Sequence, residues 1–158
     1  IISTGMATRD EIMHAVEVLK KNNCIPTVLH CTSAYPTPHD EANLAAIKEI
    51  HNLTGCETGW SDHTVNPGVI NRAIHRWNAK VIEFHLDLDG KGDEYEAGHC
   101  WLPNQIAPII QQVKQAFEAD GSGVKEPTPS ELPDREWRAD PSDGLRPIKS
   151  IRETCKTP

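Results

Sequence analysis

The chain has 158 residues, of which 37% are hydrophobic and 25% are charged, so it is long enough for one domain with a buried core. Its formal net charge of -7 argues against a nucleic-acid or anionic-membrane partner, because such partners attract basic surfaces. No apolar run approaches the ~18 residues of a membrane span, and no signal peptide is recognisable. A cytoplasmic protein is therefore expected.

The first residues indicate whether the chain is a piece of a longer protein, and the cysteines indicate its redox compartment. The sequence opens on an apolar run at residues 1–4 without an initiator methionine, so we expect a piece of a longer protein. The five cysteines are widely spaced and include no CxxC pair. This pattern is typical of free thiols in a reducing compartment rather than of a disulfide framework.

Apolar runs and amphipathic stretches alternate along the chain and predict strands and helices in turn. Thr8 and Glu11 have the spacing of a capping box, which starts a helix, and Asn66 before Pro67 marks another helix start. In chain order, the expected elements are a strand at 1–4, a helix at 8–22, a strand at 27–32, a helix at 40–53, a strand at 57–63, a helix at 66–77, a strand at 80–86, a loop at 87–101 and a helix at 103–117.

The end of the chain differs in composition. Residues 121–158 hold six of the twelve prolines, many charges and few apolar side chains. We therefore expect residues 1–120 to form the folded α/β part and residues 121–158 to form an extended tail.

Four strand–helix units in series predict parallel strands joined by right-handed crossovers. Two architectures fit, an open doubly wound sheet and one half of a (βα)8 barrel. Polar residues follow all four strands at their carboxyl ends. Barrel enzymes draw their chemistry from several strand ends at that face, whereas an open sheet concentrates it at one switch point. The pattern favours an α/β fold of the TIM-barrel type, present as a half barrel.

Two histidines, His63 and His85, end consecutive predicted strands. Neighbouring strands lie about 4.8 Å apart, so both imidazoles can share one metal ion such as Zn, Fe, Mn or Co; the alternative is a pair of structural histidines. Glu83 lies two residues before His85 and faces the same side. Its carboxylate fits a metal ligand, a general base or a salt-bridge partner. His99, in the predicted loop, is a further residue within reach of this edge.

Hydroxyl groups follow the first three strands. Ser3 stands near a predicted helix N-terminus, a position that suits phosphate. Ser33 and Tyr35 are candidates for hydrogen bonds to an oxyanion or a sugar. Ser61 and Asp62 directly precede a candidate metal ligand, and Asp62 either orients a histidine or caps the following helix.

Four motifs occur in the order and spacing of the N-acetylneuraminate (sialic acid) synthase family, which the chain resembles over roughly residues 1–120. A single motif would carry little information, but four in order on successive strands are specific. The motifs are Ser3-Thr4-Gly5-Met6-Ala7, His30-Cys31-Thr32-Ser33-Ala34-Tyr35-Pro36, Ser61-Asp62-His63-Thr64 and Glu83-Phe84-His85.

The resemblance implies a fold. The family forms a (βα)8 barrel, of which this chain would hold the last four βα units, and an antifreeze-like domain often follows. Residues 121–158 do not resemble that domain, whose arginine reaches a partner subunit's site. Arg138 or Arg146 is the hypothesised substitute for this arginine.

The resemblance also implies an activity. The family condenses phosphoenolpyruvate with N-acetylmannosamine or a related N-acyl sugar aldehyde, forming a sialic acid and releasing phosphate. A divalent metal, usually Mn²⁺, is held by the histidines that match His63 and His85, and we count Glu83 with them as a catalytic candidate. The positions that match the substrate pocket are Ser3, Ser33, Tyr35, Ser61 and Glu94.

The first four βα units of the family lie outside this sequence, so the chain by itself is expected to be inactive. The exposed edges of a half barrel also favour self-association, and a homodimer is expected. Two other interpretations stay open: a non-catalytic half-barrel module that binds a metal or ligand, and another metal-dependent aldolase-type barrel.

Overall fold

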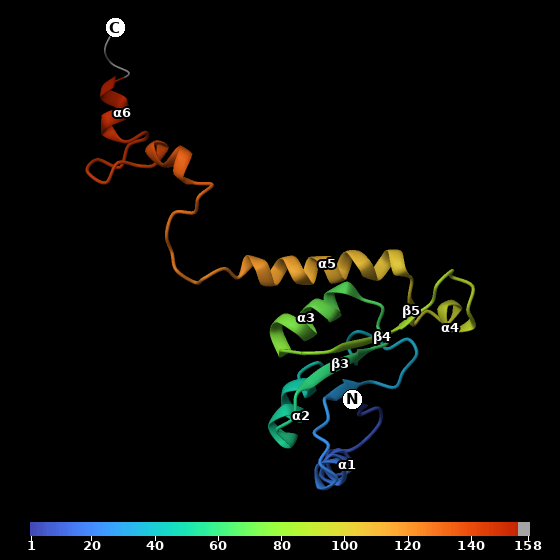
Figure 1. The fold of residues 1–158 in the computed structure, drawn as a ribbon. Helices are drawn as coiled ribbons and strands as arrows, with labels where there is room; N and C mark the ends of the chain where they lie inside the picture. Colours follow the sequence, from blue (N-terminus) through green and yellow to red (C-terminus); the bar gives the residue numbers. More distant parts are fainter. Residues whose placement is uncertain (155–158) are drawn as a thin grey trace. The chain divides into compact units, whose positions relative to one another are not determined.

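The computed structural model describes residues 1–154, and these contain one five-stranded parallel sheet in the order β1-β2-β3-β4-β5. The chain divides into two compact units, residues 1–117 and 118–158. Figure 1 traces the alternation of strands and helices in the first unit. The elements are β1 (Ile2–Ser3), α1 (Arg9–Lys21), β2 (Val28–Cys31), α2 (Ala46–Thr54), β3 (Thr58–Asp62), α3 (Pro67–Trp77), β4 (Ile82–Leu86), α4 (Asp93–Glu96), β5 (Cys100–Trp101) and α5 (Pro103–Ala119).

The two predicted helix starts are confirmed, and a glycine sets the end of a third helix. Thr8 and Glu11 form the complete capping box at the start of α1. Asn66 caps α3, with its side chain accepting from the backbone N–H of Gly68. Gly55 ends α2 in the left-handed conformation, with φ of 68°, which glycine adopts without the strain a Cβ would cause.

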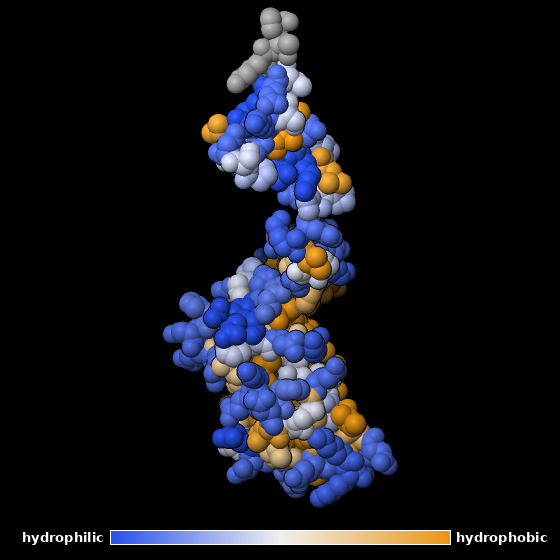
Figure 2. Space-filling view, turned by 90° about the vertical axis from the view of Figure 1, so that its left-hand side faces the viewer, coloured by the Kyte–Doolittle hydropathy of each residue, from blue (hydrophilic) through white to orange (hydrophobic). Residues whose placement is uncertain are grey.

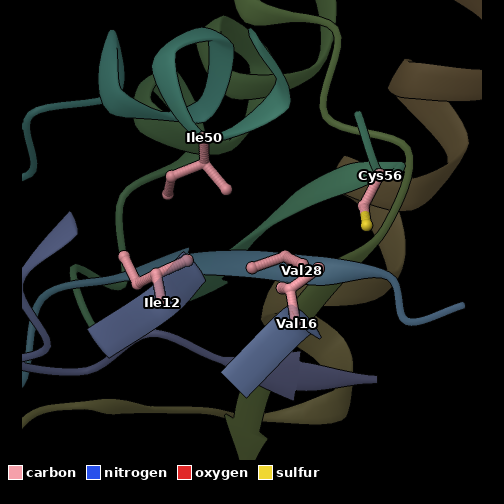
Figure 3. Packing of buried hydrophobic residues seen from close by; sticks show 5 residues of the cluster. All are labelled: Ile12, Val16, Val28, Ile50 and Cys56. Atoms are coloured by element: carbon pink, nitrogen blue, oxygen red, sulfur yellow. The ribbon is translucent and has the colours of Figure 1, made fainter. Parts of the chain in front are cut away.

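One face of the sheet packs against the helices. Figure 3 shows Ile12 and Val16 of α1 next to Val28 of β2, with Ile50 of α2 and Cys56 completing this cluster of buried residues. Two further clusters continue the core along the sheet. The first contains Ala42, Ile47, Trp60, Ala73 and Ala79, and the second contains Ile70, Trp101, Ile106 and Ile109.

Alternate strand residues form the opposite face. Side chains two apart on a strand share a face, and parallel pairing aligns Leu29 with Gly59, then Cys31 with Ser61, and Ser61 with Glu83. His85 is aligned with Cys100 in the same way. Apart from Leu29, this face therefore carries small and polar side chains, whereas large apolar side chains such as Val28, Trp60 and Ile82 lie on the helix-covered face.

Two boundaries differ from the prediction. Helix α2 begins at Ala46 rather than at residue 40, and Asn43 just before it has a left-handed φ of 43°, which interrupts a right-handed helix. The segment predicted as a loop at 87–101 contains the short helix α4 and the strand β5. Elements of two or four residues are too short to show the periodic pattern of apolar residues that predicts a strand or a helix.

The second unit, described as far as residue 154, contains short helical segments in the region where an extended tail was expected. They are a 3₁₀ helix at Leu132–Trp137 and α6 at Lys149–Thr154. The carboxylate of Asp140 accepts from the backbone N–H groups of Ser142 and Lys149. The Ser142 hydroxyl and these backbone donors lower the pKa of Asp140 to about 2, so the carboxylate stays ionised across the neutral range.

Figure 2 shows a face on which hydrophilic residues predominate and hydrophobic ones form small separate areas, as is usual for folded proteins. Among residues 1–154, no helix has the length and apolarity needed to cross a membrane. Four of the cysteines, Cys24, Cys31, Cys56 and Cys100, are free thiols, as expected; the fifth, at position 155, lies outside the described residues.

Gly59 gives the first testable prediction. A Cβ at this position would lie 2.2 Å from the carbonyl oxygen of Val81 and 2.6 Å from Cδ2 of Leu29. We expect Gly59→Ala to lower the free energy of unfolding by about 1–3 kcal/mol, the usual cost of overpacking, as measured by urea denaturation. The matched control is Gly68→Ala, where the nearest atom is the Asn66 side chain at 3.2 Å. Equal stability of both variants would contradict this packing.

Candidate metal and substrate site at the strand ends

Three imidazoles and one phenol meet at the carboxyl end of the sheet. The ring centres of His63, which follows β3, and His85 of β4 lie 5.1 Å apart. The ring of His99, just before β5, lies 5.0 Å from that of His85. The Tyr35 ring lies 4.2 Å from His63 and 5.1 Å from His99. The two histidines predicted from the sequence thus come together, and His99 joins them.

The hydrogen bonds of His63 define its tautomer. Its Nδ1 lies 2.9 Å from the carbonyl oxygen of Thr32. A carbonyl only accepts, so Nδ1 carries the proton, and the neutral ring presents an unprotonated Nε2. Metal-binding histidines are commonly fixed in this way by a backbone carbonyl. Because His63 is 3% exposed, its ring is also held by packing.

A second group of potential ligands surrounds His85. Single donor atoms of His85, Glu94, His99 and Cys100 all lie within 4.8 Å of one another. Glu94 Oε2 is 3.2 Å from His85 Nδ1, 3.9 Å from His99 Nε2 and 3.8 Å from Cys100 Sγ. These four residues could hold a metal ion. His63 is not in this group, although its ring neighbours that of His85.

Burial sets the charge of two members of the group. Desolvation lowers the pKa of His99, and the nearby His85 lowers it further against an opposing effect of the Glu94 carboxylate, so the neutral form of the ring is favoured. Desolvation raises the pKa of the Cys100 thiol, and the Glu94 carboxylate raises it further. Cation binding to this thiol would therefore release its proton.

The remaining predicted residues lie on neighbouring strand ends. The Ser61 hydroxyl donates to Glu83 Oε1 at 2.8 Å, which links β3 to β4 on the face that also carries His85. Ser3 ends β1 and is exposed. Ser33 follows β2, and its Oγ would lie 3.2 Å from a Cβ built at Gly5, so the first two strand ends are in contact.

Asp62 has a structural role rather than that of orienting a histidine. It is fully buried, and its carboxylate accepts from the indole N–H groups of Trp60 at 3.0 Å and Trp101 at 3.2 Å. It also accepts from the backbone and hydroxyl of Thr64, at 3.2 and 2.7 Å. These bonds satisfy the buried carboxylate and join β3 to β5.

The structure places two residues, Cys100 and His30, differently from what the sequence indicated. Cys100 was not a candidate, and only its place in the run Gly98-His99-Cys100-Trp101, beside a histidine in a polar segment, could have indicated it. His30, part of a recognised motif, lies on the helix side. Its Nε2 lies 3.0 Å from the Ala42 carbonyl oxygen, its ring lies 5.2 Å from that of Trp60, and burial lowers its pKa.

The parallel sheet with imidazoles at its strand ends places the chain among α/β proteins with a candidate metal site at the carboxyl edge of the sheet. The comparison with known families is specific: the model of the NeuB family matches residues 1–125. The chain belongs to this family, the family of sialic acid synthases, and the resemblance found in the sequence is confirmed.

Relatives and solved structures agree with this assignment. An N,N'-diacetyllegionaminic acid synthase of Campylobacter jejuni is 37% identical over 83% of this chain and 40% of its own length. An uncharacterised protein of Methanocaldococcus jannaschii is 37% identical over 83% of this chain and 39% of its own length. The crystal structure of an N-acetylneuraminic acid synthetase from Leptospira borgpetersenii, in complex with citrate, matches with a TM-score of 0.69 and 30% identity over 90% of this chain and 50% of that chain. The chain thus spans about two fifths of the curated relatives.

The role of Asp62 can be tested by stability. Asp62→Ala would leave two buried indole N–H groups without an acceptor, and each such loss costs about 1–3 kcal/mol. We expect the free energy of unfolding in urea to fall by about 2–5 kcal/mol. The exposed Asp120 supplies the control, since Asp120→Ala should be nearly neutral. A small effect for Asp62→Ala would contradict its assignment as the bridge between β3 and β5.

Proposed function

We propose that this chain forms the metal-binding half of a phosphoenolpyruvate-dependent sialic acid synthase barrel. The reaction joins phosphoenolpyruvate to an N-acyl mannosamine-type sugar aldehyde and releases phosphate. The observation that carries the proposal is the pair of imidazoles, His63 and His85, whose rings lie 5.1 Å apart at the strand ends of a NeuB-family fold.

The strand order supports a barrel as the complete architecture. Within residues 1–154 the strands follow one another in chain order, without the reversal that marks the switch point of a doubly wound sheet. Large apolar side chains meet helices on one face, while small and polar side chains occupy the other. A (βα)8 barrel has this arrangement, with helices outside and the second face turned inward.

The proposed metal is a divalent cation, with Mn²⁺ as the ion that the family resemblance implies. The unprotonated Nε2 of His63 fits such an ion, and His85 lies beside it. A bound cation would polarise the carbonyl group of the open-chain sugar aldehyde as a Lewis acid. The terminal CH2 carbon of phosphoenolpyruvate would then attack that aldehyde carbon, whose oxygen takes up a proton, and the adjacent carbon that carries phosphate would become cationic. Water would add to this second carbon with loss of a proton, and the resulting tetrahedral adduct would expel phosphate to leave the keto acid.

Side chains of this chain would orient the two substrates. Tyr35 is 52% exposed and lies against the ring of His63, so its hydroxyl is available to a sugar. We assign Ser3 and Ser33 to the neighbouring polar edge of the pocket. The link between Ser61 and Glu83 holds the carboxylate beside β4, as a positioned acid or base.

We assign Glu94 to orienting His85 rather than to binding the sugar. Its carboxylate contacts Nδ1 of His85 at 3.2 Å, a bond that would fix the orientation of this ring. The sequence resemblance had placed Glu94 at a sugar-binding position. Under either assignment, Glu94 would lie at the entrance of the same site.

The groups that bind phosphate would come from the remaining βα units. These are provided either by the rest of a longer chain or by association with further subunits, and a homodimer remains our proposal for the assembly. The same assembly would cover the polar face of the sheet, which carries His85 and Glu83. Light scattering that shows only monomers would contradict the dimer.

Manganese binding tests the proposed site directly. We expect this chain to bind one Mn²⁺ in a calorimetric titration, and His63→Ala to weaken that binding at least about tenfold because it removes a ligand. The control is His14→Ala, an exposed histidine of α1, which should bind as the unchanged chain does.

Turnover tests the proposed reaction. A complete barrel containing this chain should release phosphate from phosphoenolpyruvate only when the sugar aldehyde is present, and His85→Ala should lower that rate by at least about a hundredfold. Metal binding without sugar-dependent phosphate release would support the non-catalytic module instead.

A further inference from the structure

The loop that follows β2 carries two of the proposed substrate contacts, Ser33 and Tyr35, on a segment without helix or strand. Tyr35 is 52% exposed, and within residues 1–154 its hydroxyl makes no hydrogen bond that would fix the ring. The centre of the ring nevertheless lies 4.2 Å from that of His63. The position of Tyr35 at the strand ends therefore depends on the backbone of this loop.

Thr37 closes the loop. Its side chain is buried, at 3% exposure, and its hydroxyl lies 3.0 Å from the carbonyl oxygen of Thr32 and 2.9 Å from that of Ala34. A hydroxyl has one proton to donate, so the two carbonyl groups share it. These bonds join the two ends of the loop across the segment that carries Ser33 and Tyr35.

The closure includes His63. The backbone N–H of Thr37 donates to the His63 carbonyl oxygen at 2.9 Å, and His63 Nδ1 donates to the Thr32 carbonyl oxygen at 2.9 Å. Because the Thr37 hydroxyl is bonded to the same Thr32 oxygen, three hydrogen bonds form a closed ring of these residues. A carbonyl oxygen has two lone pairs and accepts both donors. One buried hydroxyl thus ties the loop and the imidazole to a single acceptor.

The sequence around Thr37 keeps the loop stiff. Pro36 and Pro38 stand on either side of it, and each proline ring fixes its own φ. The residue before a proline is also restricted to extended conformations, and this applies to Thr37 itself. Few backbone torsions are left free, so a small number of hydrogen bonds is enough to hold one conformation.

We propose that Thr37 is a positioning residue for sugar binding, whose hydroxyl holds the loop at residues 32–37 so that Tyr35 stands against His63 and contacts the sugar. Thr37 acts through the loop and not by touching a substrate. Without the hydroxyl the loop gains other conformations, and the apparent affinity for the sugar falls with the fraction of chains in the competent one. The inference rests on the proposed function in taking a sugar as the ligand of Tyr35.

Thr37→Val tests the inference, because valine keeps the shape of threonine and lacks the hydroxyl. In a complete barrel containing this chain, the KM for the sugar should rise at least about tenfold, while kcat changes less than about threefold. Thr37→Ser keeps the hydroxyl and should leave the KM within about twofold of its original value.

The matched control is Thr54→Val. Thr54 is also buried, at 5% exposure, and its hydroxyl donates to the Ile50 carbonyl oxygen at 2.8 Å, but it lies at the end of α2, outside the candidate site. Both valine variants should lose stability, whereas only Thr37→Val should raise the KM. An unchanged KM in Thr37→Val, or an equal rise in Thr54→Val, would overturn the inference.

A second measurement needs no turnover. The rings of Tyr35 and His63 are close enough for nuclear Overhauser contacts between their protons. NMR spectra of this chain and of Thr37→Ser should show these contacts, and spectra of Thr37→Val should lack them. Their persistence in Thr37→Val would also overturn the inference.

The two measurements separate this inference from the proposed function. Loss of the ring contacts in Thr37→Val, together with a complete unchanged barrel that releases no phosphate, would support Thr37 as the residue that holds Tyr35 and reject the synthase reaction. Sugar-dependent phosphate release with the same KM in Thr37→Val would keep the synthase and reject the role of Thr37.

Discussion

A buried carboxylate holds the functional end of this sheet together. Asp62 accepts hydrogen bonds from Trp60 on β3 and from Trp101 on β5, so it spans β4, which carries His85. A carboxylate without solvent is stable only when such donors surround it. Trp101 is held in one place as a result, and its neighbours His99 and Cys100 are held with it. The geometry of the candidate site therefore depends on a residue that contacts neither a substrate nor a metal.

Parallel pairing supplies the rest of the arrangement. It brings all strand ends to one edge and sends alternate side chains to opposite faces, so apolar residues such as Val28 and Ile82 meet helices while Glu83 and His85 share the polar face. His63 follows β3 at the same edge, with its tautomer set by Thr32. Side chains from several strands can in this way contribute to one site at that edge.

Much of this could be predicted from the sequence. The helix starts at Thr8 and Asn66 follow from local hydrogen bonds, which a short motif determines by itself. The proximity of His63 to His85 follows from the fixed spacing of neighbouring strands. In contrast, β5 has two residues, and its position depends on the distant Asp62, a contact across 39 residues of chain. Cys100 as a neighbour of His85 could not be predicted for that reason.

X-ray absorption spectroscopy of the manganese-loaded chain tests the central claim most directly, because it identifies the atoms bound to the metal. The account predicts a shell of nitrogen and oxygen scatterers with an imidazole contribution, which weakens in His63→Ala and is unchanged in His14→Ala. A spectrum without an imidazole contribution, or one that is the same in His63→Ala as in the unchanged chain, would contradict it.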